Sequence, residues 1–236
     1  MATIIQRVPG DFFADIFFRT LRVQSPPFVN TFNATATEYR LSTTFDSRQF
    51  AIVRGSGFTF DSDGRAVTGA IASISFFDGQ TELGSLSGLS IAALDFSDAL
   101  DDLNLGVNDA AFDALLDPLS YNLLVSTGGE ISFTGRLGDD TLEGSSDSLA
   151  AGDFLDGGAG DDLIRGDVGN DTLVGGDGTD TREYRFATIA FTGVQVDLAA
   201  GTADDPAGTQ DQISGFEIVI GTDELSTPDI LLGADG

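Results

Sequence analysis

The stretch GGAGDDLIRGDVGNDTLVGGDGTDTRE, residues 157–183, repeats every nine residues and decides the fold. Two further copies precede it, GRLGDDTLE at 135–143 and SLAAGDFLD at 148–156, with residues 144–147 inserted between them. The sixth position is Asp in all five copies: Asp140, Asp153, Asp162, Asp171 and Asp180. The eighth position is apolar in the first four copies and Arg in the fifth: Leu142, Leu155, Ile164, Leu173 and Arg182. Five carboxylates in register argue against a flexible acidic linker.

The spacing has direct physical consequences. Glycines at positions 1, 2 and 4 permit tight turns with positive φ, and positions 7–9 are long enough only for a very short strand. One repeat cannot bury its single apolar side chain alone, so neighbouring repeats must stack. Arg182 breaks the apolar pattern at position 8, and we expect it to end the regular stack.

Stacking also creates an electrostatic problem. At the strand spacing of about 4.8 Å the position-6 carboxylates lie close together. Two such charges repel by about 0.8 kcal/mol even in bulk water, and by more when partly buried. Residues 135–183 contain 13 acidic and 3 basic side chains, so a divalent cation shared between turns is needed to reverse the repulsion. Folding and cation binding are therefore expected to be one event.

The nonapeptide resembles the GGxGxDxUx repeat of the RTX, or haemolysin-type, calcium-binding family. The resemblance is close over 135–183. It is looser toward the C-terminus, where 193–222 looks like a segment between repeat blocks and 228–236 like the start of a second block. It implies a parallel β-roll in which two repeats make one turn and calcium lies between a repeat and the repeat two further along.

The resemblance also implies which atoms bind calcium. Carbonyls of positions 2 and 4 and the Asp of one repeat face carbonyls of positions 1 and 3 and the Asp two repeats later. The best-formed site is Gly158, Gly160 and Asp162 opposite Gly175, Asp177 and Asp180. A second is Leu149, Ala151 and Asp153 opposite Gly166, Val168 and Asp171, and a third is Arg136, Gly138 and Asp140 opposite Gly157, Ala159 and Asp162. Roughly three inter-turn Ca²⁺ ions follow, with dissociation constants of about 10⁻⁴–10⁻³ M.

The sequence predicts a mostly all-β chain in three parts. Residues 1–134 are expected to form a β-rich domain with one or two short helices, 135–183 the calcium-bound parallel β-roll, and 184–236 a β-rich spacer or cap with the start of a second repeat block. Within the first part, Asp63-Gly64 and Asp78-Gly79 between apolar runs predict hairpins. Helices are predicted over 96–103 and 109–116, and a last hairpin over 121–133 around Gly128-Gly129.

Composition excludes several classes of function. The 236 residues carry a net charge of −27, with no His and no Cys, and all 11 basic residues are Arg. A Ser-His-Asp or Cys-His nucleophile, a Lys Schiff base and a zinc site of His or Cys are therefore impossible in this chain. The charge disfavours nucleic acid as a partner, and no apolar run is long enough for membrane insertion. Oxygen ligands alone favour a hard cation, calcium or magnesium.

The RTX resemblance implies secretion, through a type I apparatus and without a cleaved N-terminal signal. We expect a non-enzymatic extracellular structural protein, a subunit of a surface layer, filament, matrix or adhesin, with calcium and itself or other extracellular structural proteins as partners. One alternative is the folding and targeting module of a secreted carboxylate-based glycoside-active enzyme, for which Asp95, Asp98, Asp101 and Asp102 offer candidate pairs. Others are a sugar-binding adhesin module and a virion surface protein.

Overall fold

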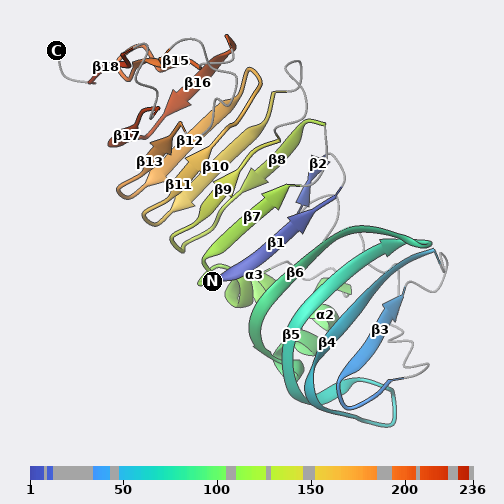
Figure 1. Cartoon of the computed structure of the whole chain (residues 1–236). Coiled ribbons are helices and arrows are strands. Elements are labelled where there is room, and N and C mark those ends of the chain that lie inside the picture. The colour runs from blue at the N-terminus through green and yellow to red at the C-terminus, as the bar shows by residue number, and fades with distance from the viewer. Residues whose placement is uncertain are drawn as a thin grey trace. The chain divides into compact units, whose positions relative to one another are not determined.

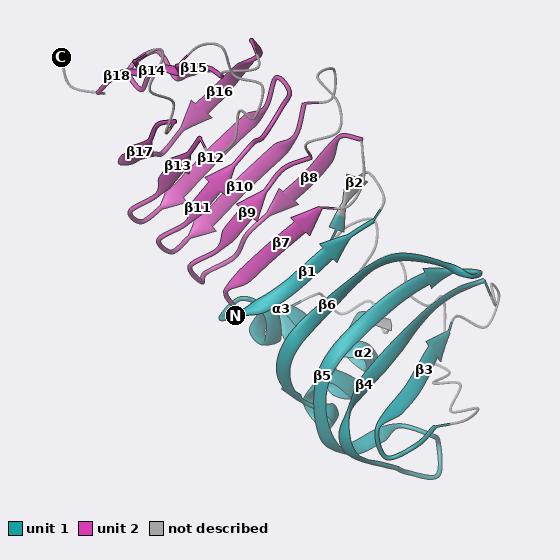
Figure 2. Cartoon of the chain, viewed as in Figure 1, with its two compact units in different colours: residues 1–7, 11–119 teal, residues 8–10, 120–236 magenta. Residues whose placement is uncertain are grey.

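The chain divides into two compact units (Figure 2). The computed structural model describes residues 1–7, 10–12, 34–42, 48–104, 110–125, 129–145, 152–184, 193–205, 208–222 and 228–233. Unit 1 comprises residues 1–7 and 11–119, and unit 2 comprises residues 8–10 and 120–236. Most of the elements in both are strands, including the two-residue β2 (Gly10–Asp11), which confirms the predicted fold class. The predicted three-part division stays a prediction, and by their contacts residues 120–134 group with the repeats.

Unit 1 is an antiparallel sheet with helices on it (Figure 1). Its strands follow the order β1-β6-β5-β4-β3. Their bounds are β1 Ala2–Gln6, β3 Glu38–Ser42, β4 Gln49–Phe60, β5 Ala66–Asp78 and β6 Thr81–Ala92. Two helices follow, α2 Ala93–Asn104 and α3 Ala110–Leu116, close to the predicted ranges. Helix α2 packs against β5 and β6, and α3 packs against α2.

Turn chemistry and aromatic packing shape this unit. In the β4–β5 turn the Asp61 carboxylate accepts hydrogen bonds from the backbone N–H groups of Asp63 (3.0 Å) and Arg65 (2.9 Å). Gly79 has φ 63° in the β5–β6 turn, a conformation that favours glycine. The ring centroids of Phe96 and Phe112 lie 5.4 Å apart, edge to face, in the core beneath the helices. Both predicted hairpins are therefore present, and unit 1 has a conventional apolar core.

Unit 2 is a roll in which successive strands alternate between two sheets (Figure 1). The first sheet stacks in parallel β7 Tyr121–Val125, β9 Thr141–Glu143, β11 Leu163–Arg165, β13 Thr181–Glu183 and β17 Ile218–Ile220. The second stacks in parallel β8 Ile131–Thr134, β10 Phe154–Ala159, β12 Thr172–Asp177 and β16 Gln210–Ser214. It continues through antiparallel β15 Thr202–Asp204 and β14 Gln195–Asp197 to β18 Ile230–Leu232. Two repeats thus make one turn.

The register places the eighth position of each repeat inside the roll. Leu142, Leu155, Ile164 and Leu173 are each 0% exposed. In the second sheet Leu155 pairs with Phe133 on one side and with Leu173 on the other, and Leu173 pairs in turn with Ile213. One side chain per repeat therefore builds a thin apolar column that exists only because the repeats stack.

The predicted hairpin over 121–133 is wrong. Strand β7 pairs with β9 and β8 pairs with β10, so the two stretches belong to opposite sheets. They form the first turn of the roll, where Leu123 takes the place of a position-8 residue and pairs with Leu142. A glycine-rich turn between two apolar runs is compatible with both arrangements, and the repeats that follow supply the parallel partner strands.

The expectation that Arg182 ends the stack is also wrong. Strand β13, which contains it, pairs with β11 on one side and with β17 on the other. Arg182 is only 1% exposed, and its guanidinium donates a 3.0 Å hydrogen bond to the buried carboxylate of Asp211. Because Asp211 neutralises the charge of Arg182 inside the roll, an arginine is tolerated at position 8 and the stack continues.

Substitution of Leu173 by Asp is expected to unfold the roll. The variant L173D puts a carboxylate into the apolar column, which should cost more than about 4 kcal/mol. The matched control T172D places the same charge on the exposed neighbouring residue of the same strand, and it should cost less than about 1 kcal/mol. Circular dichroism at saturating calcium measures both. A native β signal in L173D would show that the column is misassigned.

Candidate metal site

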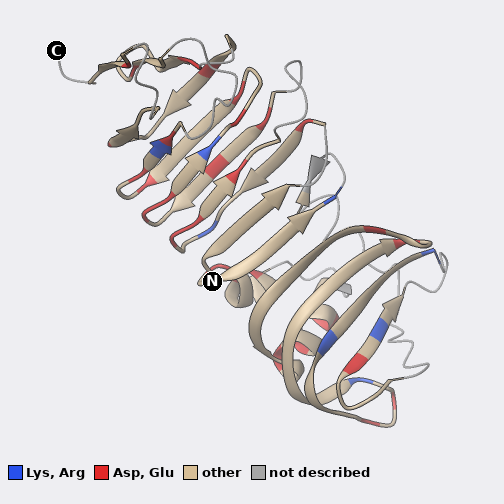
Figure 3. Ribbon diagram, viewed as in Figure 1, with Lys and Arg blue, Asp and Glu red and all other residues tan. Residues whose placement is uncertain are grey.

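The position-6 aspartates form two columns inside the roll. The first column, here called the first ladder, is Asp140, Asp162 and Asp180, and the second ladder is Asp153 and Asp171. All five are at most 2% exposed. They are aligned because each stands just before a strand, and strands two repeats apart pair in parallel without a shift of register. Acidic residues lie in the loops and on the strands of unit 2 (Figure 3).

One oxygen of each ladder carboxylate is held by the neighbouring turn. The backbone N–H of Asp140 donates to Asp162 Oδ1 at 2.7 Å, and that of Asp162 donates to Asp180 Oδ1 at 2.9 Å. In the second ladder the N–H of Asp153 donates to Asp171 Oδ1 at 2.8 Å. In the first turn of the roll, the N–H of Tyr121 donates to Asp140 Oδ1 and the N–H of Ile131 donates to Asp153 Oδ1. These hydrogen bonds therefore fix the orientation of the carboxylates in the folded roll.

The other oxygen is buried and lacks a hydrogen bond. Among the described residues, no group donates to Oδ2 of Asp140, Asp162, Asp171 or Asp180. A buried anion without a partner is costly, and it is stable only with a cation beside it or with a proton on it. Loss of hydration by burial accordingly raises the pKa of Asp140 and Asp171 to about 7 and that of Asp162 to about 6.

Backbone carbonyls come close to these free oxygens at glycines. A Cβ atom on Gly157 would lie 2.5 Å from the carbonyl oxygen of Gly175 and closer still to Asp162 Oδ2. A Cβ atom on Gly135 would likewise collide with the Gly157 carbonyl and with Asp140 Oδ2. Position 1 must therefore be glycine for these two oxygens, one from each of two adjacent turns, to approach each other. Paired carboxylate and carbonyl oxygens are the donor set that suits calcium.

In the first predicted site, and likewise in the third, the loops of the two repeats that would share the ion stack on each other. Residues of the third site meet where the N–H of Ala159 donates to the Arg136 carbonyl at 2.7 Å. A Cβ atom on Gly160 would lie 2.7 Å from the Gly138 carbonyl. In the first site the N–H of Gly160 donates to the Asp177 carbonyl at 2.9 Å. The repeats thus face each other in the predicted pairs, and the assignment of individual carbonyls as ligands stays a prediction.

The second predicted site is built differently. Leu149 and Ala151 lie outside the described residues. Asp153 Oδ2 accepts a 2.6 Å hydrogen bond from the N–H of Ser145, so it is not free like the other four. A Cβ atom on Gly144 would lie 2.7 Å from Asp153 Oδ2, which places Gly144 at position 1 of this repeat. Positions 1 and 6 of this repeat are therefore nine residues apart in the sequence, whereas Gly157 and Asp162 are five apart.

No group of three or more acidic side chains that could hold a metal ion is found within the described ranges. When bound, calcium would supply the positive charge that these buried oxygens lack. The residues of the roll therefore fit calcium, and they do so through backbone shape as much as through side chains.

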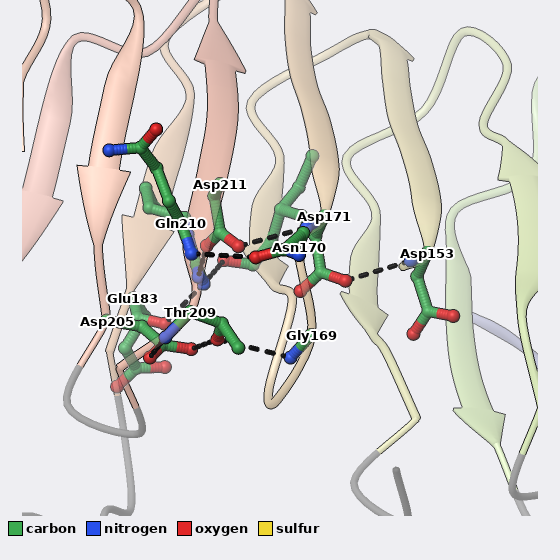
Figure 4. A network of polar contacts seen from close by, with 11 residues as sticks. Asp153, Gly169, Asn170, Asp171, Glu183, Asp205, Thr209, Gln210 and Asp211 are labelled. Carbon is green, nitrogen blue, oxygen red and sulfur yellow. Dashed lines mark hydrogen bonds and ion pairs between the residues drawn. The ribbon is translucent and has the colours of Figure 1, made fainter. Parts of the chain in front are cut away.

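Two members of the ladders were missed by the sequence analysis. The N–H of Asp171 donates to Asp211 Oδ1 at 3.1 Å, and the N–H of Asp180 donates to Glu217 Oε2 at 2.9 Å. Figure 4 shows Asp153, Asp171 and Asp211 in line, joined by these hydrogen bonds. The signal was an acidic residue two positions before an apolar strand residue, Ile213 or Val219, without the glycines of the repeat.

The comparisons with known proteins agree with this geometry. Residues 149–181 match the family model of the RTX calcium-binding nonapeptide repeat, in four copies. This segment consists of RTX repeats. Neither a curated protein nor a solved structure matches the chain. RTX repeats bind calcium and are typical of secreted bacterial proteins. None of the helices in the described part of the chain is long and apolar enough to cross a membrane.

Removal of one ladder charge should weaken calcium binding. In D162N the amide oxygen can still accept from Asp140, but the free anionic oxygen is gone, so affinity should fall by at least about tenfold. D180N should act in the same way. The matched control D161N changes the adjacent exposed residue by the same charge and keeps an oxygen for the N–H of Thr179. Calorimetric titration with calcium tests this, and equal affinities in D162N and D161N would refute the site.

The calcium-free roll should be more stable in mild acid. Its carboxyl groups have raised pKa values, up to about 7 for Asp140 and Asp171, so the folded state binds more protons than the unfolded chain. The contribution of these carboxyl groups to the free energy of unfolding is then complete below about pH 4. It is lost as the pH rises through their pKa values in the folded state. Calcium affinity should change in the opposite direction, rising with pH, because the cation displaces these protons.

Thermal unfolding of calcium-stripped protein, followed by circular dichroism at about pH 5 and about pH 8, measures this effect. The melting temperature should be lower at the higher pH without calcium, and added calcium should restore it there. A calcium-free roll that is more stable at the higher pH would contradict the burial of unpaired carboxylates.

Proposed function

We propose that the chain is a non-enzymatic extracellular structural protein that folds its roll on calcium. It would serve as a subunit of a surface layer, filament, matrix or adhesin, and its partners would be copies of itself or other extracellular structural proteins. Low calcium inside the producing cell would keep the repeats unfolded for export through a type I apparatus, and calcium outside would then fold them.

The observation that carries the proposal is the apolar edge of the roll. Strands β17 and β18 are the outer strands of the two sheets among the described residues. Their aliphatic side chains are far from buried: Ile218 is 43% exposed, Ile220 47%, Ile230 49%, Leu231 47% and Leu232 53%. Open strand edges with exposed aliphatic side chains favour association with further β-structure. Such edges suit a protein that assembles.

The carboxylates of α2 support a structural role over a glycosidase. Arg65 forms ion pairs with both Asp98 and Asp101, at 3.2 Å for Asp101. Both carboxylates are thus tied to the guanidinium of the β4–β5 turn. A glycosidase pair instead has its two carboxyl groups on either side of the bond to be cleaved. These aspartates are better explained as an exposed helix face fastened to the β4–β5 turn.

A calcium titration of the chelated protein tests the proposal. Circular dichroism should show a cooperative gain of β signal, and light scattering should show growth into multimers over the same calcium range. Magnesium at equal concentration is the matched control, because it demands a small octahedral site and should do less. A gain of β signal at constant monomer mass would refute the structural role and favour a binding or enzymatic module. Hydrolysis of polysaccharides by the folded protein would refute it as well.

A further inference from the structure

The two ladders end differently beyond the repeats, and one end has the properties of another metal site. We propose that Asp180, Gly215 and Glu217 form a further calcium site at the last turn of the first ladder. It lies at the junction of the fifth repeat with a segment that has no nonapeptide pattern. The inference rests on calcium binding by the roll and is independent of the structural role proposed above.

Asp180 supplies a free, fully buried oxygen at this junction. The residue is 0% exposed, and its Oδ1 accepts the N–H of Asp162 at 2.9 Å. Among the described residues nothing donates to its Oδ2. In the turn before it, Asp162 Oδ2 and the carbonyl oxygen of Gly175 both lie close to where a Cβ atom on Gly157 would be. Asp180 Oδ2 therefore needs an equivalent partner from the turn above.

Gly215 provides that partner. A Cβ atom on Gly175 would lie 2.7 Å from Asp180 Oδ2 and would collide with the carbonyl oxygen of Gly215. In the same way, a Cβ atom on Gly157 would lie close to both Asp162 Oδ2 and the Gly175 carbonyl oxygen. Gly215 thus occupies position 1 of the next turn, with φ 71°, although it lies outside the repeats.

Glu217 takes the part of the next position-6 aspartate. Its Oε2 accepts the N–H of Asp180 at 2.9 Å, as Asp180 Oδ1 accepts the N–H of Asp162. Only Phe216 separates it from Gly215, whereas four residues separate Gly175 from Asp180. The longer glutamate side chain bridges the gap that the shortened loop leaves. The chemistry is that of the ladder, rebuilt from a different sequence.

The shortened loop predicts a weaker site. Positions 2 to 5 have no counterpart between Gly215 and Glu217, so fewer main-chain oxygens are available, and both residues are exposed. Calcium accepts six to eight oxygen ligands and readily includes water among them. We therefore expect an open site that fills after the sites inside the roll.

The second ladder offers no equivalent site. Its last carboxylate, Asp211, already accepts a 3.0 Å hydrogen bond from the guanidinium of Arg182 through Oδ2. Arg182 supplies the positive charge there. Among the described residues of the roll, no ion pair includes Asp180 or Glu217. The inference is thus specific: one additional ion, on the first ladder only.

Counting bound calcium at saturation by equilibrium dialysis tests this site. E217Q keeps an oxygen for the N–H of Asp180 and loses the charge, so it should bind one ion fewer than the unmodified chain. D180N removes a carboxylate shared by two sites and should lose two. The control E130Q makes the same change at an exposed residue beside β8, in the first turn of the roll, and should leave the count unchanged.

Hydrogen exchange gives a second readout that does not depend on the ion count. Amides of β17 should become protected at a higher calcium concentration than those of β11 and β13, and E217Q should abolish that later step. An unchanged ion count in E217Q, or protection of all three strands at one calcium concentration, would overturn the proposal. Absence of any calcium binding by the unmodified chain would instead refute calcium binding by the repeats themselves.

Discussion

The roll depends on the different roles of the two oxygens of the ladder carboxylates. One oxygen accepts a main-chain N–H of the adjacent turn, at 2.7 to 2.9 Å within the first ladder, and so sets the stacking distance and register. In Asp140, Asp162, Asp171 and Asp180 the other oxygen is buried without a partner among the described residues. The same side chain therefore aligns the turns and makes them repel. A bound cation removes that conflict, since it uses the oxygen that the protein leaves free.

The two units differ in how much they need the cation. Unit 1 buries Phe76, Phe96 and Phe112 in an ordinary core, with α2 and α3 packed on each other. Burial of each large apolar side chain contributes about 1.5–3 kcal/mol, and none of the buried side chains described in this unit is charged. A nonapeptide of the roll buries one position-8 side chain and one carboxylate. The gain and the electrostatic cost are then of similar size, and we therefore expect folding of the roll to depend on calcium.

The sequence predicted those parts of the roll that follow from its period. Position 8 as the core and position 6 as the ladder follow from the nine-residue spacing, and two repeats per turn is what the resemblance to the RTX repeat implied. What it did not predict lies where other residues continue the stack without the glycines. Gly144, Asp211 and Glu217 are examples, each recognisable only by its register with a residue of the next turn. Parallel pairing is a long-range property, so a local pattern search missed them.

Arg182 shows how far a local rule can mislead. A charged residue at an apolar position predicts disruption, yet its guanidinium donates to the Asp211 carboxylate and to the carbonyls of Ile164 and Glu183. It also lies 4.0 Å from the centroid of the Tyr184 ring. Asp211 is 0% exposed, so an apolar residue at position 182 would leave a buried carboxylate unpaired.

Removal of one partner from a buried ion pair typically costs about 3–5 kcal/mol, which exceeds the gain from one more aliphatic side chain in the column. The apolar residue of the repeat pattern is therefore the less stable choice at this position. The pattern holds where a bound calcium ion would supply the positive charge. Where the second ladder ends, the protein supplies that charge itself, and the residue that breaks the repeat is the one that lets the stack continue.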